Sequence, residues 1–136
     1  MIAAFAGEGR NGESRARLLS AWVVLVALHS YAVGTFLLFA TEWGARFGGF
    51  GAVSPLFFAR QAGIFHFVIA TAYLVERFVH GGVVVLLIAK ATAVVFLLAM
   101  WALGVDAWSI PLSAAADVAM GIATLLLARR EPASPV

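Results

Sequence analysis

The sequence contains no cysteine among its 136 residues. This absence excludes a disulfide framework, a thiolate metal site, an iron–sulfur cluster and a cysteine nucleophile, because each of them needs a thiol. Charge is also scarce, since 12% of the residues are charged, against about 25% in an average soluble domain. Lys90 is the only lysine, and the other basic residues are arginines at the ends of apolar segments. This pattern argues against a nucleic-acid-binding surface and indicates a membrane topology signal.

Hydrophobic residues are what the chain has in excess. They make up 63% of it, whereas soluble domains average about 45–50%. A soluble chain of this length has too little interior to bury so much apolar surface, but a lipid bilayer can cover it. The composition therefore predicts a single-domain integral membrane protein. We expect it in the inner (cytoplasmic) membrane of the cell, with membrane lipids around it.

Four long apolar runs follow one another along the chain, at residues 18–40, 56–75, 83–104 and 110–128. At about 1.5 Å per residue, each run matches a hydrocarbon core roughly 30 Å thick. Backbone groups inside a bilayer have no water to bond, so membrane-spanning segments of this length are helices. The predicted fold class is all-α, an integral membrane four-helix bundle over residues 17–130.

The segments outside these runs predict tails and turns. Residues 1–16 alternate glycine with charged residues and show no apolar period, so we expect a flexible N-terminal tail, with a C-terminal tail over residues 131–136. Residues 44–55 are rich in glycine and predict a loop, and residues 80–82 predict a tight turn. Ser109 is the expected N-cap of the last helix, with Pro111 in its first turn.

The turns and the arginines together predict the topology. Short connections make neighbouring helices antiparallel, which gives an up-down-up-down bundle. Positive residues favour the cytoplasmic side. Six arginines fall at one side of the predicted bundle and only Arg46 and Arg60 at the other; the six are Arg10, Arg15, Arg17, Arg77, Arg129 and Arg130. Both termini are therefore predicted to be cytoplasmic.

Polar side chains inside the spans are the candidate functional residues. Each costs a few kcal/mol in lipid unless it finds a partner. We expect a buried polar cluster shared by the four helices, made of His29, Arg60, Gln61, His66, Tyr73, Lys90 and Asp117. Asp117 is the only acidic residue deep in a span, so it is predicted to pair with Lys90. A structural ion pair is the favoured interpretation over a catalytic one.

The two intramembrane histidines leave alternatives open. His29 and His66 lie at matched depth on adjacent predicted helices, as a bis-histidine haem b or a quinone site requires. For either histidine alone, a hydrogen bond to a neighbouring helix is the favoured interpretation. Arg60 and Gln61 are alternatively explained by reaching the membrane interface. No zinc, phosphate-binding or dinucleotide motif is present, so no metal site and no catalytic residue are predicted.

One segment supports a family resemblance. The arginine that opens the second run, in Phe58-Ala59-Arg60-Gln61-Ala62-Gly63, is followed by Lys90 inside the third run. With four short spans, this arrangement resembles the DoxX-like superfamily of small four-helix membrane proteins over residues 17–130. Arg60, Gly63 and Lys90 carry the resemblance. It implies an accessory subunit near a quinone and implies no catalytic residue.

Three functions are consistent with these patterns. The first is a non-catalytic accessory or structural subunit of a larger membrane complex of respiratory or photosynthetic electron-transfer type, with other integral membrane subunits as partners and no activity on its own. The second is a membrane anchor that binds haem b or quinone through His29 and His66. The third is a small transporter or lipid-binding protein. Bound lipid or pigment is a further expected ligand class.

Overall fold

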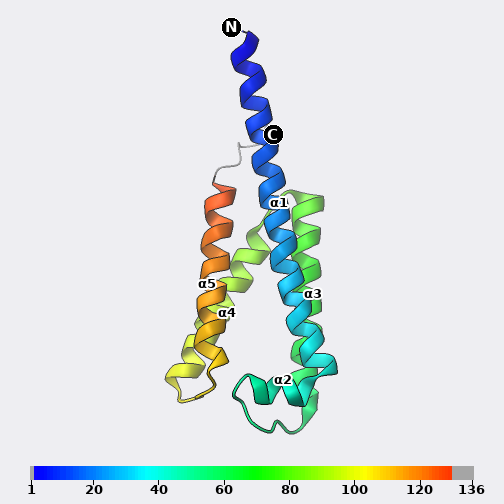
Figure 1. Cartoon of the computed structure of the whole chain (residues 1–136), viewed down its shortest axis with the longest axis vertical. Coiled ribbons are helices and arrows are strands. Elements are labelled where there is room, and N and C mark those ends of the chain that lie inside the picture. Colours follow the sequence, from blue (N-terminus) through cyan, green and yellow to red (C-terminus); the bar gives the residue numbers. More distant parts are fainter. Residues whose placement is uncertain (1, 130–136) are drawn as a thin grey trace.

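The chain folds into helices alone over the part that the structure describes. The computed structural model describes the backbone of residues 2–129 and the side chains of residues 12–129. Five helices occur there: α1 (Ile2–Phe39), α2 (Thr41–Phe47), α3 (Leu56–His80), α4 (Val84–Ala102) and α5 (Ser109–Ala128) (Figure 1). The predicted all-α class is confirmed. Arg130 and the predicted tail over residues 131–136 lie outside the described residues.

Four of the helices are long and apolar enough to cross a membrane. They are Gly12–Phe39 within α1, together with the whole of α3, α4 and α5. The predicted third and fourth spans agree with α4 and α5 to within two residues at each end, whereas α3 continues beyond residue 75 as far as His80. The prediction of a multi-pass membrane protein is therefore confirmed.

Helix α1 begins earlier than the sequence pattern indicates. It starts at Ile2, so residues 2–16, predicted to form a flexible tail, are helical in the structure. Extending an existing helix adds one hydrogen bond for each residue ordered, and no proline stands in the way. Glu13 and Arg17 also form an exposed ion pair of 3.5 Å, one helical turn apart. The hydrophobic pattern therefore locates the start of the apolar part of α1 but does not locate the start of the helix itself.

Helix α2 is a short element that the sequence analysis does not predict. It follows α1 after a single residue, and the Thr41 hydroxyl donates a hydrogen bond of 2.7 Å to the Leu37 carbonyl at the end of α1. The Trp43 and Phe47 rings stack on its outer face, with ring centroids 5.1 Å apart. Seven residues are too few for a period of 3.6 to be recognised. The loop predicted from residue 44 therefore starts only after Phe47.

Helices α1 and α3 form a tightly packed antiparallel pair, side by side in Figure 1. At one end Arg77 donates to the Ser20 hydroxyl at 3.0 Å, and further along α1 the Tyr31 and Thr71 hydroxyls are 2.7 Å apart. Residue numbers rise along one helix while they fall along the other, as antiparallel packing requires. The buried core lies mainly between these two helices and consists of Leu19, Val23, Val26, Ala27, Ala70, Tyr73 and Leu86.

The turn between α3 and α4 is held by a carboxylate. Both Glu76 oxygens accept hydrogen bonds of 2.8 Å, one from the Val84 amide and one from the Val85 amide. A carboxylate at this position satisfies donors that the first turn of a helix leaves unpaired and complements the helix dipole. Gly81 adopts a left-handed backbone conformation with φ of 71°, which glycine reaches without strain. The predicted tight turn over residues 80–82 is thus present, with His80 still in α3.

The opposite end of the molecule is closed by contacts between α2 and the α4–α5 turn (Figure 1). The Trp108 indole donates to the Phe47 carbonyl at 2.6 Å. The Ser109 hydroxyl donates to the Gly48 carbonyl, also at 2.6 Å. The prediction that Ser109 is the N-cap of α5 is wrong, because Trp108 holds that position without a side-chain cap. The hydrogen bond that the Ser109 side chain makes is instead a donation to the Gly48 carbonyl, which is distant in sequence.

Candidate functional site

The centre of the candidate site is an ion pair between α4 and α5. The Lys90 Nζ lies 2.7 Å from Asp117 Oδ1, and the two side chains are 9% and 13% exposed. Gly121 is one turn beyond Asp117, and a Cβ there would lie 3.8 Å from the Lys90 Cβ, so α5 packs close to the lysine stem. The predicted pairing is confirmed. Each charge neutralises the other in an environment where either alone is costly.

His66 and Tyr73 are the two polar residues of the predicted cluster that lie near the middle of α3. They are seven residues apart and so lie on one face of the helix. His66 is half-buried and Tyr73 is buried. His66 Nδ1 is buried without a hydrogen-bond partner in the described part of the chain. The structure therefore keeps His66 and Tyr73 at least partly inside the bundle, as it does Lys90 and Asp117.

His29 is exposed, outside the packed interior in which the sequence analysis expects it. Successive residues on a helix point about 100° apart, and Ser30, the next residue, already occupies the α1 face that is buried. His29 is therefore turned away from the packed interior.

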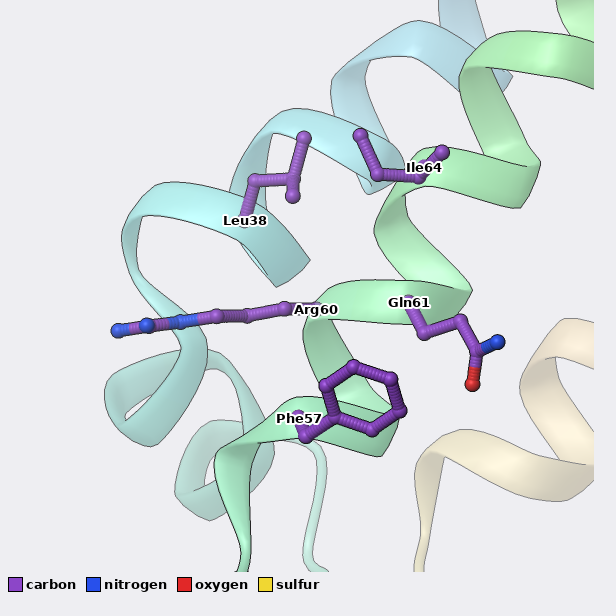
Figure 2. Close-up of a pocket in the computed structure, with 5 residues that line it drawn as sticks. All are labelled: Leu38, Phe57, Arg60, Gln61 and Ile64. Atoms are coloured by element: carbon purple, nitrogen blue, oxygen red, sulfur yellow. The ribbon is translucent and has the colours of Figure 1, made fainter.

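Arg60 and Gln61 lie nearer the α2 end of the molecule, apart from the ion pair. Arg60 precedes His66 by six residues, which is about 9 Å along the axis of a helix. Both side chains are exposed, outside the packed interior. They line a pocket of about 440 Å³ together with Leu38, Phe57 and Ile64 (Figure 2). The pocket lies where α1 ends at Phe39, because the short α2 does not cover this part of α3 as a longer spanning helix would.

Several residues that shape the site were not recognised in the sequence. The Trp22 indole donates to the Thr124 hydroxyl at 3.0 Å, which connects α1 to α5 at the end away from α2. Arg77 is buried and also donates to the Gly81 carbonyl at 3.0 Å. The α3 residues that line the pocket could have been recognised from their spacing in the sequence. They are three or four residues apart, as on one face of a helix: Phe57, Arg60, Gln61 and Ile64.

Within residues 12–129, no group of three histidine, cysteine, aspartate or glutamate side chains is arranged to hold a metal ion. Comparisons with protein-family models, with curated proteins and with solved structures find no match for this chain. The geometry defines its class: a small multi-pass α-helical membrane protein with an ion pair between two of its membrane-spanning helices.

Proposed function

We propose that this protein is a non-catalytic structural subunit of a larger integral membrane complex, of the kind that carries out respiratory or photosynthetic electron transfer. The observation that supports it is the exposure of His29, the central residue of the apolar run over residues 18–40. An imidazole facing hydrocarbon loses its hydrogen bonds to water and gains none. A helix of another subunit against this part of α1 supplies the missing partner.

The apolar surface of the chain does not carry this proposal. Large apolar side chains are exposed along every span, with Phe39, Val95 and Leu112 among them. Lipid covers such surfaces as well as protein does, because lipid tails are as apolar as leucine. Only a polar group at mid-depth distinguishes a protein partner from lipid. The exposed imidazole therefore marks which side of α1 meets another subunit.

The resemblance to the DoxX-like superfamily is part of this proposal. In the structure, Gly63 lies against α1 and Lys90 pairs with Asp117, so two of the three matched residues hold helices together. Arg60, the third, lies exposed beside a pocket. Residues that pack helices together are consistent with an accessory subunit, which stabilises a complex and provides contact surface but performs no reaction.

We further infer that both termini face the cytoplasm in an up-down-up-down topology. The arginine bias supports this orientation, since Arg15, Arg17 and Arg77 lie at the end of the bundle opposite α2. A reporter fused after Val136 and one inserted after Phe50, in the loop following α2, are expected to lie on opposite sides of the membrane. Activity of a cytoplasm-specific reporter at both positions would contradict the topology.

The assembly itself is tested through the face of α1 that carries His29. Leu25 is one helical turn from His29 and 58% exposed, so a photoreactive amino acid there samples the proposed interface without removing the histidine. We expect it to cross-link to another membrane protein in intact membranes. The matched control is the same group at Val95 on α4, which is 70% exposed. The Val95 position is expected to give lipid adducts.

Substitution of the histidine provides the complementary measurement. His29→Leu is expected to reduce co-purification of the cross-linked partner about fivefold, in line with a single interhelical hydrogen bond in a membrane. Its fold should be unaffected, because the side chain is exposed. Unchanged co-purification, or a chain that transports or reacts in liposomes with no other subunit present, would overturn the proposal.

A second function is supported by a different observation, the unpartnered Nδ1 of His66. We propose as the alternative that the region between His29 and His66 binds a quinone, whose carbonyl oxygens accept hydrogen bonds from ring nitrogens. Haem b fits less well. A histidine that ligates a metal through one ring nitrogen normally donates the N–H of the other to a carbonyl, carboxylate or water, and His66 Nδ1 has no such partner among the described residues. An absorption spectrum and solvent extraction of the purified protein distinguish haem, quinone and neither, with His66→Phe as the variant expected to lose the ligand.

A further inference from the structure

Two adjoining pockets lie where α3 meets the end of α1 and the start of α2. The first has a volume of about 440 Å³ and is the pocket of Figure 2. The second, of about 230 Å³, is lined by Phe39, Ala40, Thr41, Glu42, Trp43, Leu56 and Arg60. Arg60 borders both, so they are parts of one surface feature. We call it the α2-end pocket.

The first part of the α2-end pocket is mainly apolar. Leu38 comes from α1, and Phe57 and Ile64 come from one face of α3. In Figure 2 the Arg60 side chain extends away from α3 past the end of α1, while Gln61 points to the other side of α3. The space between Leu38, Phe57 and Ile64 is thus left to an apolar ligand. Its volume falls within the range of about 300–1,000 Å³ that is typical of small-molecule sites.

The second part brings opposite charges to the same place. Arg60 and Glu42 both line it, both are exposed, and neither forms an ion pair or a hydrogen bond within residues 12–129. The Trp43 indole, an amphipathic ring of the kind found at headgroup level, lies beside them. A ligand that matches this surface carries an anionic and a cationic group close together.

We propose that the α2-end pocket binds a zwitterionic phospholipid with a primary ammonium in its headgroup, of the phosphatidylethanolamine class. The phosphate binds the Arg60 guanidinium, whose planar fork matches phosphate oxygens. The ammonium donates to the Glu42 carboxylate, and an acyl chain lies along Leu38, Phe57 and Ile64. Arg60 is four residues into α3, about 6 Å from its first residue, a depth from which arginine reaches the phosphate layer.

The pair of charges selects among lipids. An anionic lipid such as phosphatidylglycerol satisfies Arg60 but leaves Glu42 without a cation. A choline headgroup carries a positive charge but has no N–H to donate to the carboxylate. Each lacks one charge-assisted hydrogen bond that the ethanolamine headgroup makes, which corresponds to about a tenfold difference in affinity.

The test is a lipid titration of the purified full-length chain in mild detergent, followed by native mass spectrometry. Phosphatidylethanolamine is expected to bind about tenfold more tightly than phosphatidylglycerol or phosphatidylcholine with the same acyl chains. Arg60→Gln should weaken its binding about tenfold, and Glu42→Gln should abolish the preference over phosphatidylglycerol. Arg46→Gln, which removes an exposed arginine of α2 that lines neither part of the pocket, is the matched control and should change nothing.

Two further measurements separate a lipid site from a simple charged surface. Ile64→Trp fills the apolar part without touching either charge and is expected to displace the lipid. Free phosphoethanolamine, the headgroup alone, is expected to bind far more weakly than the lipid. Equal binding of the three lipids, an equal loss from Arg46→Gln, unchanged binding by Ile64→Trp, or headgroup binding as tight as lipid binding would each overturn the proposal. Circular dichroism confirms that every variant is folded.

Discussion

Replacement of Asp117 by asparagine is expected to lower the free energy of unfolding by about 3–5 kcal/mol, as is measured when one partner of a buried ion pair is removed. The variant leaves the Lys90 ammonium, whose side chain is 9% exposed, without its carboxylate. An asparagine amide fills the same space but cannot neutralise the charge. The cost is therefore that of an unpaired cation inside the bundle rather than that of a cavity.

The double variant Lys90→Met, Asp117→Leu should recover much of this loss, because it removes both charges and keeps apolar volume. Unfolding in mixed detergent micelles measures all three proteins. Glu13→Gln serves as the control, since its ion pair with Arg17 is exposed and expected to contribute nothing measurable. An Asp117→Asn variant that unfolds at the same denaturant fraction as the unmodified protein would show that the pair is not structural.

The second large effect is expected at the contact of Gly34 with Gly63, where α1 and α3 approach most closely. A Cβ on Gly63 would lie 2.9 Å from the Gly34 carbonyl oxygen, and a Cβ on Gly34 would lie 2.8 Å from the Gly63 carbonyl oxygen. Both obstacles are backbone atoms, so a whole helix has to move. Gly63→Ala is expected to cost about 1–3 kcal/mol, typical of overpacking, and Gly63→Leu should prevent the native α1/α3 packing.

Gly121→Ala on α5 is the matched control for this experiment. A Cβ at Gly121 would be 3.8 Å from the nearest atom, the Lys90 Cβ, which is an ordinary contact. Alanine there is expected to be neutral or slightly stabilising, because it restricts the unfolded chain. The same micelle unfolding experiment compares the two positions. Similar stability of Gly63→Ala and Gly121→Ala would mean that the close approach of α1 and α3 does not hold the fold.

The number and position of the spans were predictable because a bilayer imposes a local rule. About 20 consecutive apolar residues are needed to cross it. All four runs are found within helices, with nearly the expected ends for α4 and α5, whereas α1 begins earlier and α3 ends later than predicted. The Lys90–Asp117 pair was predictable for a related reason. A chain with one lysine and one acidic residue deep in its spans has few ways to avoid a buried unpaired charge.

The burial of the other polar residues was not predictable in this way. His29, Arg60 and Gln61 are exposed although they lie in apolar runs. Helices that are apolar all round carry no stripe that distinguishes the face toward protein from the face toward lipid. The rotation of each helix about its axis is set instead by close packing. Gly34, at the contact with Gly63, lies one helical turn from the buried Ser30 on the same face of α1, and His29 is left exposed. Helix α2 was missed because seven residues are too few to show a helical period, and its end is held by the hydrogen bond from the Trp108 indole to the Phe47 carbonyl, which joins segments far apart in the chain.

The sequence by itself determined that this protein is α-helical, crosses a membrane with four segments and joins Lys90 to Asp117. These features follow from hydrogen-bond satisfaction and from the cost of charge in lipid, which act on each segment separately. Only the tertiary structure decided which helices pair, that His66 keeps a buried nitrogen without a hydrogen-bond partner in the described part of the chain, and that Arg60 and Glu42 border one pocket. Those features depend on the rotation and contact of helices far apart in the chain, which hydrophobicity along a single helix does not encode.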